Sequence, residues 1–222
     1  MKKAIRFLFL VSIFGVLGGF LFFSNYGQRG SGINKTEDRQ VESFQRIVIE
    51  GFGRLNVSSG ETQSVEVTID DDLIDLIETS VSRDGTLLLR PTTALNPKVD
   101  LVYDIVVPEL TRVELAGAAS LQLNDVSADA LVIELAGACG AYGSGNVDKL
   151  TLELAGACRA RLKELQARVT NVEVAGTGSA EVFASASLNA EASGVASITC
   201  YGNPPQVKKE ANGISKVSIA GS

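Results

Sequence analysis

Six glutamates recur at nearly equal spacing in the second half of the chain, and no other set of its residues is better placed for chemistry. Each stands three positions before a glycine, and successive copies are 18 to 20 residues apart. If the repeats stack as neighbouring strands, the carboxylates form one column with about 4.8 Å between neighbours. The column consists of Glu114, Glu134, Glu153, Glu173, Glu191 and Glu210.

Three interpretations of this glutamate column are open: a strip for divalent cations, a docking face for a basic partner, and a charged stripe that only keeps the surface soluble. The last is favoured. One carboxylate per repeat supplies too few ligands for a tight calcium site, and the chain lacks a Gly-Gly-x-Gly-x-Asp repeat. We therefore expect no metal and no cofactor, and the column remains a weak metal candidate.

The cysteines offer a second kind of chemistry. Cys139 and Cys158 each follow their repeat glycine by two residues. In stacked repeats their Cα atoms would lie about 4.8 Å apart, which a disulfide permits. The alternative, which we favour, is a ladder of small buried side chains. Cys200 is expected to pack inside the fold, and a chain without histidine supplies neither a catalytic cysteine pair nor a zinc site.

A polysaccharide lyase or hydrolase is the competing functional class. Such an enzyme needs paired carboxylates across a cleft, or clustered acids beside a catalytic arginine. Arg159 and Arg161 should face outward, where they can equally well pair with neighbouring acids. The remaining clustered acids are interpreted as capping and solvated charge at a helix start; they are Asp70, Asp71, Asp72 and Asp75. We therefore predict a non-catalytic protein.

Short strands must position all these residues. Two of the six repeat copies read Val-Glu-Leu-Ala-Gly-Ala-Ala-Ser-Leu (113–121) and Leu-Glu-Leu-Ala-Gly-Ala-Cys-Arg-Ala (152–160). Their apolar residues alternate, which is the period of a strand. Two strands per copy should meet at the glycine, and polar turns such as 124–129 should link one copy to the next. The pattern predicts an all-β fold, a parallel β-helix solenoid with coils of about 19 residues.

An exposed alanine column runs beside the glutamates in this arrangement. A flat apolar strip flanked by charge could pack against another copy or a partner, although simple tolerance of alanine explains the pattern almost as well. The possible contact strip consists of Ala116, Ala136, Ala155 and Ala175.

The N-terminal end predicts export. Lys2, Lys3 and Arg6 precede a 17-residue apolar run from Phe7 to Phe23, so residues 1–23 are expected to be a signal peptide or an uncleaved signal anchor, an apolar helix that would attach the protein to the membrane. Residues 24–40 should form a flexible linker. The body would then lie outside the cytoplasm, in the periplasm or anchored in the cell envelope.

Residues 41–222 should form one domain, in which 41–110 cover one end of the coils at 111–222. Arg46 to Val57 resembles a degenerate coil, with Gly53, Leu55 and Val57 in the positions of Ala119, Leu121 and Leu123. The formal charge is −6, and subtracting the three basic residues of the first 23 leaves −9 for the rest. So acidic a body argues against nucleic acid as a partner and leaves a protein or glycan partner, or self-association, as expectations.

The order of several motifs resembles a known family. Ser43-Phe44-Gln45-Arg46-Ile47, Val106-Val107-Pro108-Glu109-Leu110, the Ala-Gly-Ala repeats and Tyr201-Gly202-Asn203-Pro204 are similar to the family called "putative auto-transporter adhesin, head GIN domain". The resemblance implies a right-handed single-stranded β-helix with a β-rich N-terminal part, in exported bacterial envelope proteins. It brings no catalytic residues, and it implies a binding or scaffold module, with adhesion or protein–protein interaction in the envelope as its role.

Overall fold

The structure, a computed structural model, describes residues 27–220. Strands dominate this part of the chain, and its only helix is a 3-10 turn, η1 (Ile74–Leu76). The predicted all-β class is therefore confirmed. The signal segment and apolar helix predicted at residues 1–23 lie outside the described residues. No helix between residues 27 and 220 combines the length and apolar character needed to cross a membrane.

The strands are β1 (Gln28–Arg29), β2 (Asn34–Asp38), β3 (Arg46–Ser59), β4 (Ser64–Asp70), β5 (Ile77–Val81), β6 (Thr86–Pro91), β7 (Leu95–Asn96), β8 (Val102–Val107), β9 (Arg112–Gly137), β10 (Gly140–Gly156), β11 (Arg159–Phe183), β12 (Ser187–Tyr201), β13 (Gln206–Gly213) and β14 (Lys216–Ala220).

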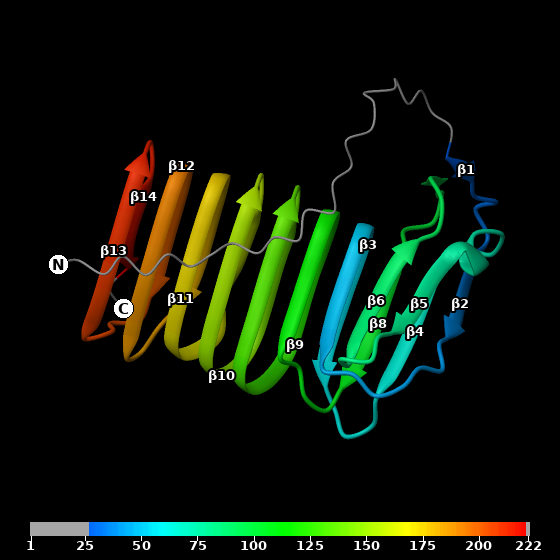
Figure 1. Ribbon diagram of the computed structural model, residues 1–222, viewed down its shortest axis with the longest axis horizontal. Coiled ribbons are helices and arrows are strands. Elements are labelled where there is room, and N and C mark those ends of the chain that lie inside the picture. The colour runs from blue at the N-terminus through cyan, green and yellow to red at the C-terminus, as the bar shows by residue number, and fades with distance from the viewer. Residues whose placement is uncertain (1–26, 221–222) are drawn as a thin grey trace.

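One sheet contains twelve of these strands, in the order β13-β12-β11-β10-β9-β3-β8-β4-β2 with β14, β5 and β6 attached beside it. From β3 to β13 each neighbouring pair along this order is parallel. Figure 1 shows these strands side by side as successive turns of a stack, with β8, β4 and β2 at the opposite end from β13. Each repeat therefore hydrogen-bonds to the repeat before it and the repeat after it.

The register of this stack matches the repeat in the sequence. Gly156 pairs with Gly137 on one side and with Gly176 on the other. The predicted equivalence of residues 46–57 to the repeat is also confirmed, because Gly53, Leu55 and Val57 pair with Ala119, Leu121 and Leu123.

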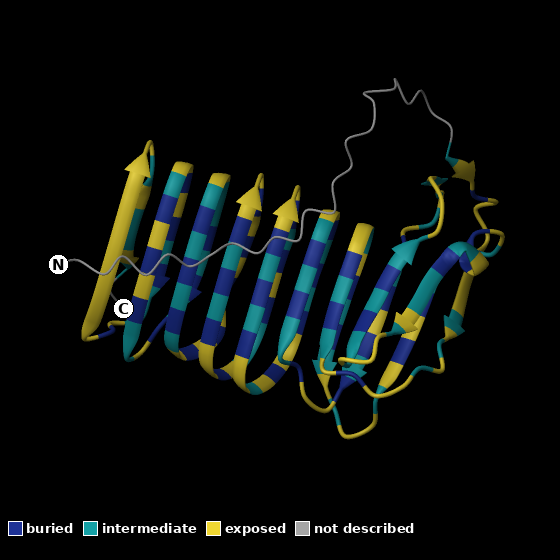
Figure 2. Ribbon diagram, viewed as in Figure 1, coloured by how far each residue is buried: buried dark blue, intermediate teal, exposed yellow. Residues whose placement is uncertain are grey.

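Alternation along each strand places the apolar residues inside, as predicted. Val113, Leu115, Leu152 and Leu154 are at most 2 % exposed, and Figure 2 shows the same alternation of buried and more exposed residues along the neighbouring strands. Burial of such side chains from every coil produces one continuous narrow core, which is the main stabilising contribution.

The segments predicted as turns between coils are instead a third extended side. Asn146 pairs with Ser127 and Gln166, and Val147 pairs with Ala128 and Ala167. Val147 is 5 % exposed, so this side also sends a residue into the core. The prediction missed it because each segment carries few large apolar residues, and a small alanine does not reveal a strand.

The predicted flexible linker at 24–40 is wrong for its described residues, 27–40. β1 pairs with β7, and β2 pairs antiparallel with β4. Thr36 and Thr68 also share a hydrogen bond between their hydroxyls, 2.7 Å long. The glycines of this segment let the chain run closely over the sheet instead of making it flexible.

Candidate functional site

The glycine corner is the sharpest local feature of each coil. Gly117, Gly137, Gly156 and Gly176 have φ between +102° and +129°, a region that other residues rarely adopt. A Cβ on Gly156 would lie 2.6 Å from the carbonyl oxygen of Gly137. Only glycine therefore lets the coils approach closely at this corner.

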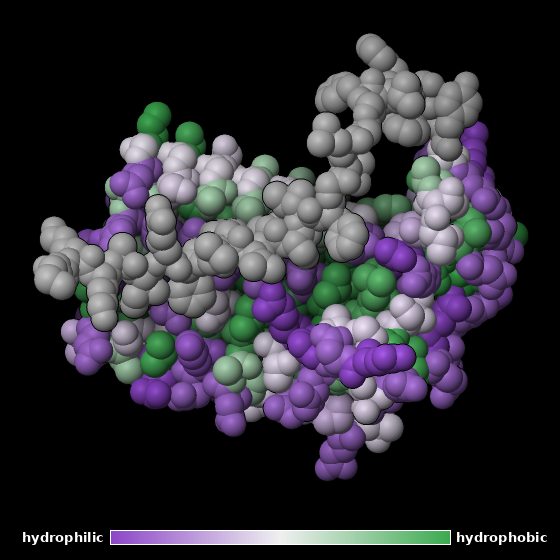
Figure 3. Space-filling model, in the orientation of Figure 1, coloured by the Kyte–Doolittle hydropathy of each residue, from purple (hydrophilic) through white to green (hydrophobic). Residues whose placement is uncertain are grey.

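The residues before and after these glycines form a continuous solvent-accessible surface, which we call the apolar edge. Ala136 and Ala155 are exposed, and both are in register with their neighbours. Figure 3 shows a band of pale and green atoms along the upper border of the molecule, where β9 and β10 end in Figure 1. The apolar edge consists of Ala116, Ala136, Ala155 and Ala175 before the glycines, and Ala118, Ala138, Ala157, Thr177, Val195 and Ile214 after them.

The last coils extend this edge with larger side chains. Val195 is 55 % exposed and Ile214 is 81 % exposed. Ser193 and Asn212 take the place of the alanines in these coils. In these two coils the apolar residue of the edge is therefore the one after the glycine and not the one before it.

The predicted glutamate column exists. Glu153 pairs with Glu134 and Glu173, and Glu191 pairs with Glu173 and Glu210. Val48 replaces the glutamate in the first coil, where it pairs with Glu114. Within residues 27–220 no three His, Cys, Asp or Glu side chains gather into a group able to hold a metal ion.

Burial and like charge act on the same carboxyls. Partial burial raises the pKa of Glu114, Glu153 and Glu173, and a neighbouring glutamate in the column raises each pKa further. Arg112 opposes this for Glu114 and Glu153, and it forms a 2.5 Å ion pair with Glu134. Lys208 forms a second ion pair, 3.0 Å long, with Glu210 at the end of the column. The column is therefore a repulsive row of acids that basic side chains relieve at two positions.

The structure has Cys139, Cys158 and Cys200 as free, buried thiols, so the possible disulfide between Cys139 and Cys158 is not formed in it. The Cys139 sulfur lies 3.5 Å from the Gly117 carbonyl oxygen, and the Cys158 sulfur 3.5 Å from that of Gly137. Each thiol therefore contacts the backbone of the preceding coil at the glycine corner. This agrees with the favoured prediction of a ladder of small buried side chains.

Asp70 has a role that the sequence did not reveal. Its carboxylate is fully buried and accepts backbone hydrogen bonds from Gly32 (2.6 Å), Lys98 (3.0 Å) and Val99 (3.0 Å). Burial alone would raise the pKa of this carboxyl, but the backbone donors together outweigh burial and lower it. Asp70 thus fastens the N-terminal segment and the loop around Lys98 to the sheet.

The acids next to Asp70 contact the N-terminal segment or solvent. Asp71 and Asp72 accept hydrogen bonds from the hydroxyl and the backbone N–H of Ser31, and Asp75 is exposed. The helix start predicted for this stretch is only the 3-10 turn η1, because β5 begins directly after it at Ile77.

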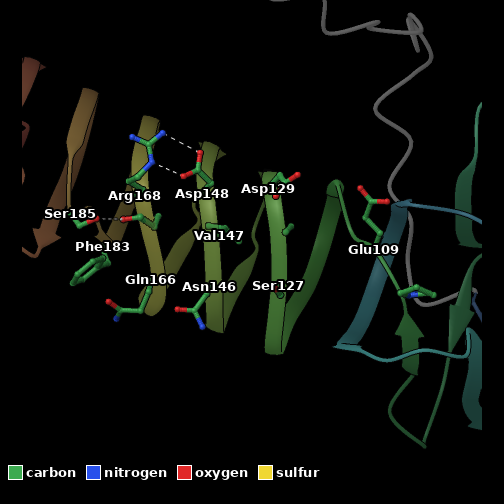
Figure 4. A pocket seen from close by; sticks show the side chains of 13 residues that line it. Glu109, Ser127, Asp129, Asn146, Val147, Asp148, Gln166, Arg168, Phe183 and Ser185 are labelled. Atoms are coloured by element: carbon green, nitrogen blue, oxygen red, sulfur yellow. Dashed lines mark hydrogen bonds and ion pairs between the residues drawn. The ribbon is translucent and has the colours of Figure 1, made fainter.

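An open groove of about 830 Å³ crosses the third side of the coils. Its floor includes Val147, and Figure 4 shows Asp148 and Arg168 on one side of this residue and Asn146 and Gln166 on the other. Arg168 donates two hydrogen bonds to Asp148, of 2.5 and 3.2 Å. The groove carries polar groups suited to binding and no pair of unengaged carboxylates facing one another across it.

The fold and these surfaces together define an all-β repeat protein that exposes an apolar edge and a polar groove. The sequence model of the family described as "Putative auto-transporter adhesin, head GIN domain" matches residues 43–204. The chain therefore belongs to this family, which confirms the resemblance seen in its motifs.

Solved structures with a similar fold include proteins of Bacteroides and Parabacteroides species. A putative adhesin of Bacteroides fragilis is 20 % identical with a TM-score of 0.73, and the alignment covers 87 % of this chain and all of that one. A putative adhesin of Parabacteroides merdae is 18 % identical (TM-score 0.54), and a putative lipid binding protein of Parabacteroides distasonis is 20 % identical (TM-score 0.54); each alignment covers 86 % of this chain and 98 % of the other. No curated protein matches the sequence.

Proposed function

We propose that this protein is a non-catalytic, adhesin-like binding module of the cell envelope, and that its apolar edge docks a second copy of the same chain. The observation that carries the proposal is the apolar edge itself, a mostly apolar, solvent-accessible surface built from the same positions of successive coils, with polar side chains only at Thr177, Ser193 and Asn212. Contiguous apolar patches of this kind mark interaction surfaces.

The proposal includes the finer architecture. Residues 111–222 would form a right-handed, single-chain parallel β-helix, with 41–110 covering one end. The parallel pairing of β9 to β13 and the register between successive glycines support it. A solenoid presents identical positions in straight columns, which is what a long docking edge requires.

Charges on the two flanks of the edge favour a second copy as the occupant. The glutamate column lies on one flank, three residues before the glycines. The positions three residues after them carry Arg159, Lys216 and Arg54, the last of which also pairs with Asp100, and no acid. Two copies packed edge to edge with their coils in the same order place the glutamates of each opposite the basic flank of the other, which is complementary.

The location is part of the same proposal. Residues 1–23 would direct export and, if uncleaved, tether the module, so that residues 27–220 lie outside the cytoplasm. The adhesin names of the family and of the similar structures support an envelope role.

The test is sedimentation velocity of the purified protein over a range of concentrations. Because the edge is narrow, we expect a weak dimer, and Ala155→Lys should abolish it by placing a charge in the middle of the edge. Ala94→Lys, a matched change at an exposed residue of the loop before β7, should leave it intact.

Two results would overturn the docking edge: a protein that stays monomeric at every concentration, or a dimer that Ala155→Lys leaves unchanged. Circular dichroism of each variant must show the same thermal unfolding as the wild type, so that a lost dimer is not mistaken for a lost fold.

A further inference from the structure

A group of basic and aromatic side chains lies on the outer surface of the strands that follow the glycine corner. Tyr142 and Arg161 are in register on β10 and β11, and the Arg161 guanidinium lies 5.6 Å from the centre of the Tyr142 ring. Arg161 also donates a 3.4 Å hydrogen bond to the Tyr142 hydroxyl. The Lys163 ammonium lies 5.7 Å from the centre of the Tyr201 ring.

These side chains form a connected patch across neighbouring coils. Tyr201 pairs with Phe183 of the coil before it, and Phe183 also lines the groove shown in Figure 4. We call the set of Tyr142, Arg161, Lys163, Phe183 and Tyr201 the basic–aromatic patch. The patch is accessible, since Tyr142 is 43 % exposed and both basic residues are exposed. Lys163 has an exposed acid beside it in sequence, Glu164, whose carboxylate lies 3.9 Å from the Lys163 ammonium.

Arg161 differs from most arginines of the protein in having no acidic partner within the described residues. Arg39, Arg46, Arg54, Arg90, Arg112 and Arg168 each form an ion pair with a carboxylate. Arg161 faces a tyrosine instead. The structure therefore does not show the alternative pairing of Arg161 with a neighbouring acid. The remaining N–H donors of the Arg161 guanidinium are available to a ligand.

We propose that the basic–aromatic patch binds an acidic polysaccharide, with sugar rings packed on Tyr142 and Tyr201 and acidic groups bound by Arg161 and Lys163. The C–H faces of a sugar ring are apolar and suit an aromatic ring, while its hydroxyls need nearby hydrogen-bonding groups. Gln122 supplies such a group beside Tyr142, and Thr199 and Ser218 share a register pair further along the same surface.

The overall charge favours a sparsely charged polymer over nucleic acid. The chain after residue 23 carries a formal charge of −9, which repels a polyanion with a charge on every unit. A polysaccharide that alternates acidic and neutral sugars can reach two local cations while only every second sugar is charged. The patch extends the proposed binding role to a second surface, distinct from the apolar edge.

The experiment is affinity electrophoresis and calorimetry of the full chain with three probes. Hyaluronan, whose acidic and neutral sugars alternate, should bind, neutral dextran should not, and inorganic polyphosphate should bind more weakly than hyaluronan. Arg161→Ala should weaken hyaluronan binding roughly tenfold, the value of a hydrogen bond to a charged group. Tyr142→Ala should weaken it by roughly three- to tenfold.

Two matched variants serve as controls. Arg83→Ala changes an exposed arginine in the turn between β5 and β6 and should have no effect. The backbone hydrogen bond from Ser179 to Cys158 places Glu181, in the next coil, beside Arg161. Glu181→Gln removes this acid and should strengthen hyaluronan binding.

The proposal is overturned if hyaluronan does not bind or binds no better than dextran. It is also overturned if polyphosphate binds at least as well and Tyr142→Ala has no effect, because the patch is then a simple polyanion site. Since the apolar edge is tested by sedimentation without any glycan, failure of one proposal is distinguishable from failure of the other.

Discussion

Single buried charges matter in a fold whose core is as narrow as this one. Asp70 accepts three backbone hydrogen bonds from two separate segments, 32 and 98–99. A carboxylate can accept all of them at once, whereas an amide must turn a donor toward at least one N–H group.

We predict that Asp70→Asn lowers the free energy of unfolding by about 2 kcal/mol. Urea unfolding measures the loss, and limited proteolysis should show faster cleavage within residues 28–38, because the substitution releases this segment first. Asp75→Asn, at an exposed position, is the matched control. Equal stability of the two variants would remove Asp70 from its anchoring role.

The glutamate column lowers the stability of the folded protein by an amount that depends on pH. The pKa values of Glu114, Glu153 and Glu173 are raised in the folded protein. Between the ordinary glutamate pKa and these raised values the folded state binds more protons than the unfolded chain, so the contribution of these groups to stability falls as pH rises through that window.

Glu153→Gln should therefore stabilise the protein by about 0.5 kcal/mol at pH 7, since it removes repulsion with two cross-strand neighbours. The gain should disappear below the ordinary glutamate pKa, where the wild-type side chains are protonated. Thermal unfolding at several pH values measures it, with Glu61→Gln in an exposed turn as the control. A gain that is the same at all pH values would argue against repulsion as its cause.

Alkylation of the thiols tests whether the cysteines are buried and unbridged. Burial raises the pKa of the Cys158 and Cys200 thiols, so alkylation of the native protein should be slow. After denaturation without reductant, mass spectrometry should find all three cysteines modified. One modified cysteine would instead reveal a bridge between Cys139 and Cys158.

Residue roles were predicted from sequence only where they repeat. The glutamate column follows directly from a spacing that recurs in six copies of the repeat, and the alanine column from the same spacing in four of them. Asp70 was interpreted as helix capping because its partners are backbone groups far away in the sequence. Tyr142 was missed as well, although its position one coil before Arg161 follows from the repeat.

At the scale of a coil, the glycine corner determines how closely neighbours stack. A methyl group at Gly156 meets both a left-handed φ of +102° and the carbonyl oxygen of Gly137 at 2.6 Å. These two penalties act together, and the neighbouring backbone cannot move without disturbing its own coil.

Gly156→Ala should accordingly destabilise the protein by about 3 kcal/mol. Two other glycines separate the causes. Gly85→Ala, with φ +75° and open space, should cost about 1 kcal/mol, and Gly140→Ala, with open space and no such φ, should be nearly neutral. Equal losses at all three positions in chemical denaturation would refute the steric explanation.

Strands with large alternating residues were predictable, and the third side of each coil was not. The alternating Leu152 and Leu154 are enough to predict a strand. On the third side each coil has a single inward residue between polar neighbours, and these residues are Ala128, Val147 and Ala167. Their strand character comes from pairing with adjacent coils, which is tertiary information. The antiparallel β2 depends in the same way on β4.

For the whole molecule, nearest-neighbour pairing implies uneven local stability. Each coil contacts only adjacent coils, and within residues 27–220 β13 pairs with β12 alone. All eight residues of β13 are exposed. Local opening should therefore begin there and proceed along the stack.

Hydrogen exchange should show this gradient. Backbone amides of β13 and β14 should exchange fastest, and those of β9 to β11, which are paired on both sides, slowest. Uniform protection from β9 to β14 would mean that the repeats unfold as one unit.

The register also has an evolutionary consequence. Val132 is paired with Thr151, so a deletion of residues 132–150 would join Leu131 to Thr151 and leave every later side chain pointing in its original direction. Recombination that adds or removes such a segment changes the length of the molecule by about 4.8 Å while preserving the inside and the outside of the fold. Evolution can therefore lengthen or shorten the protein one coil at a time without a new core.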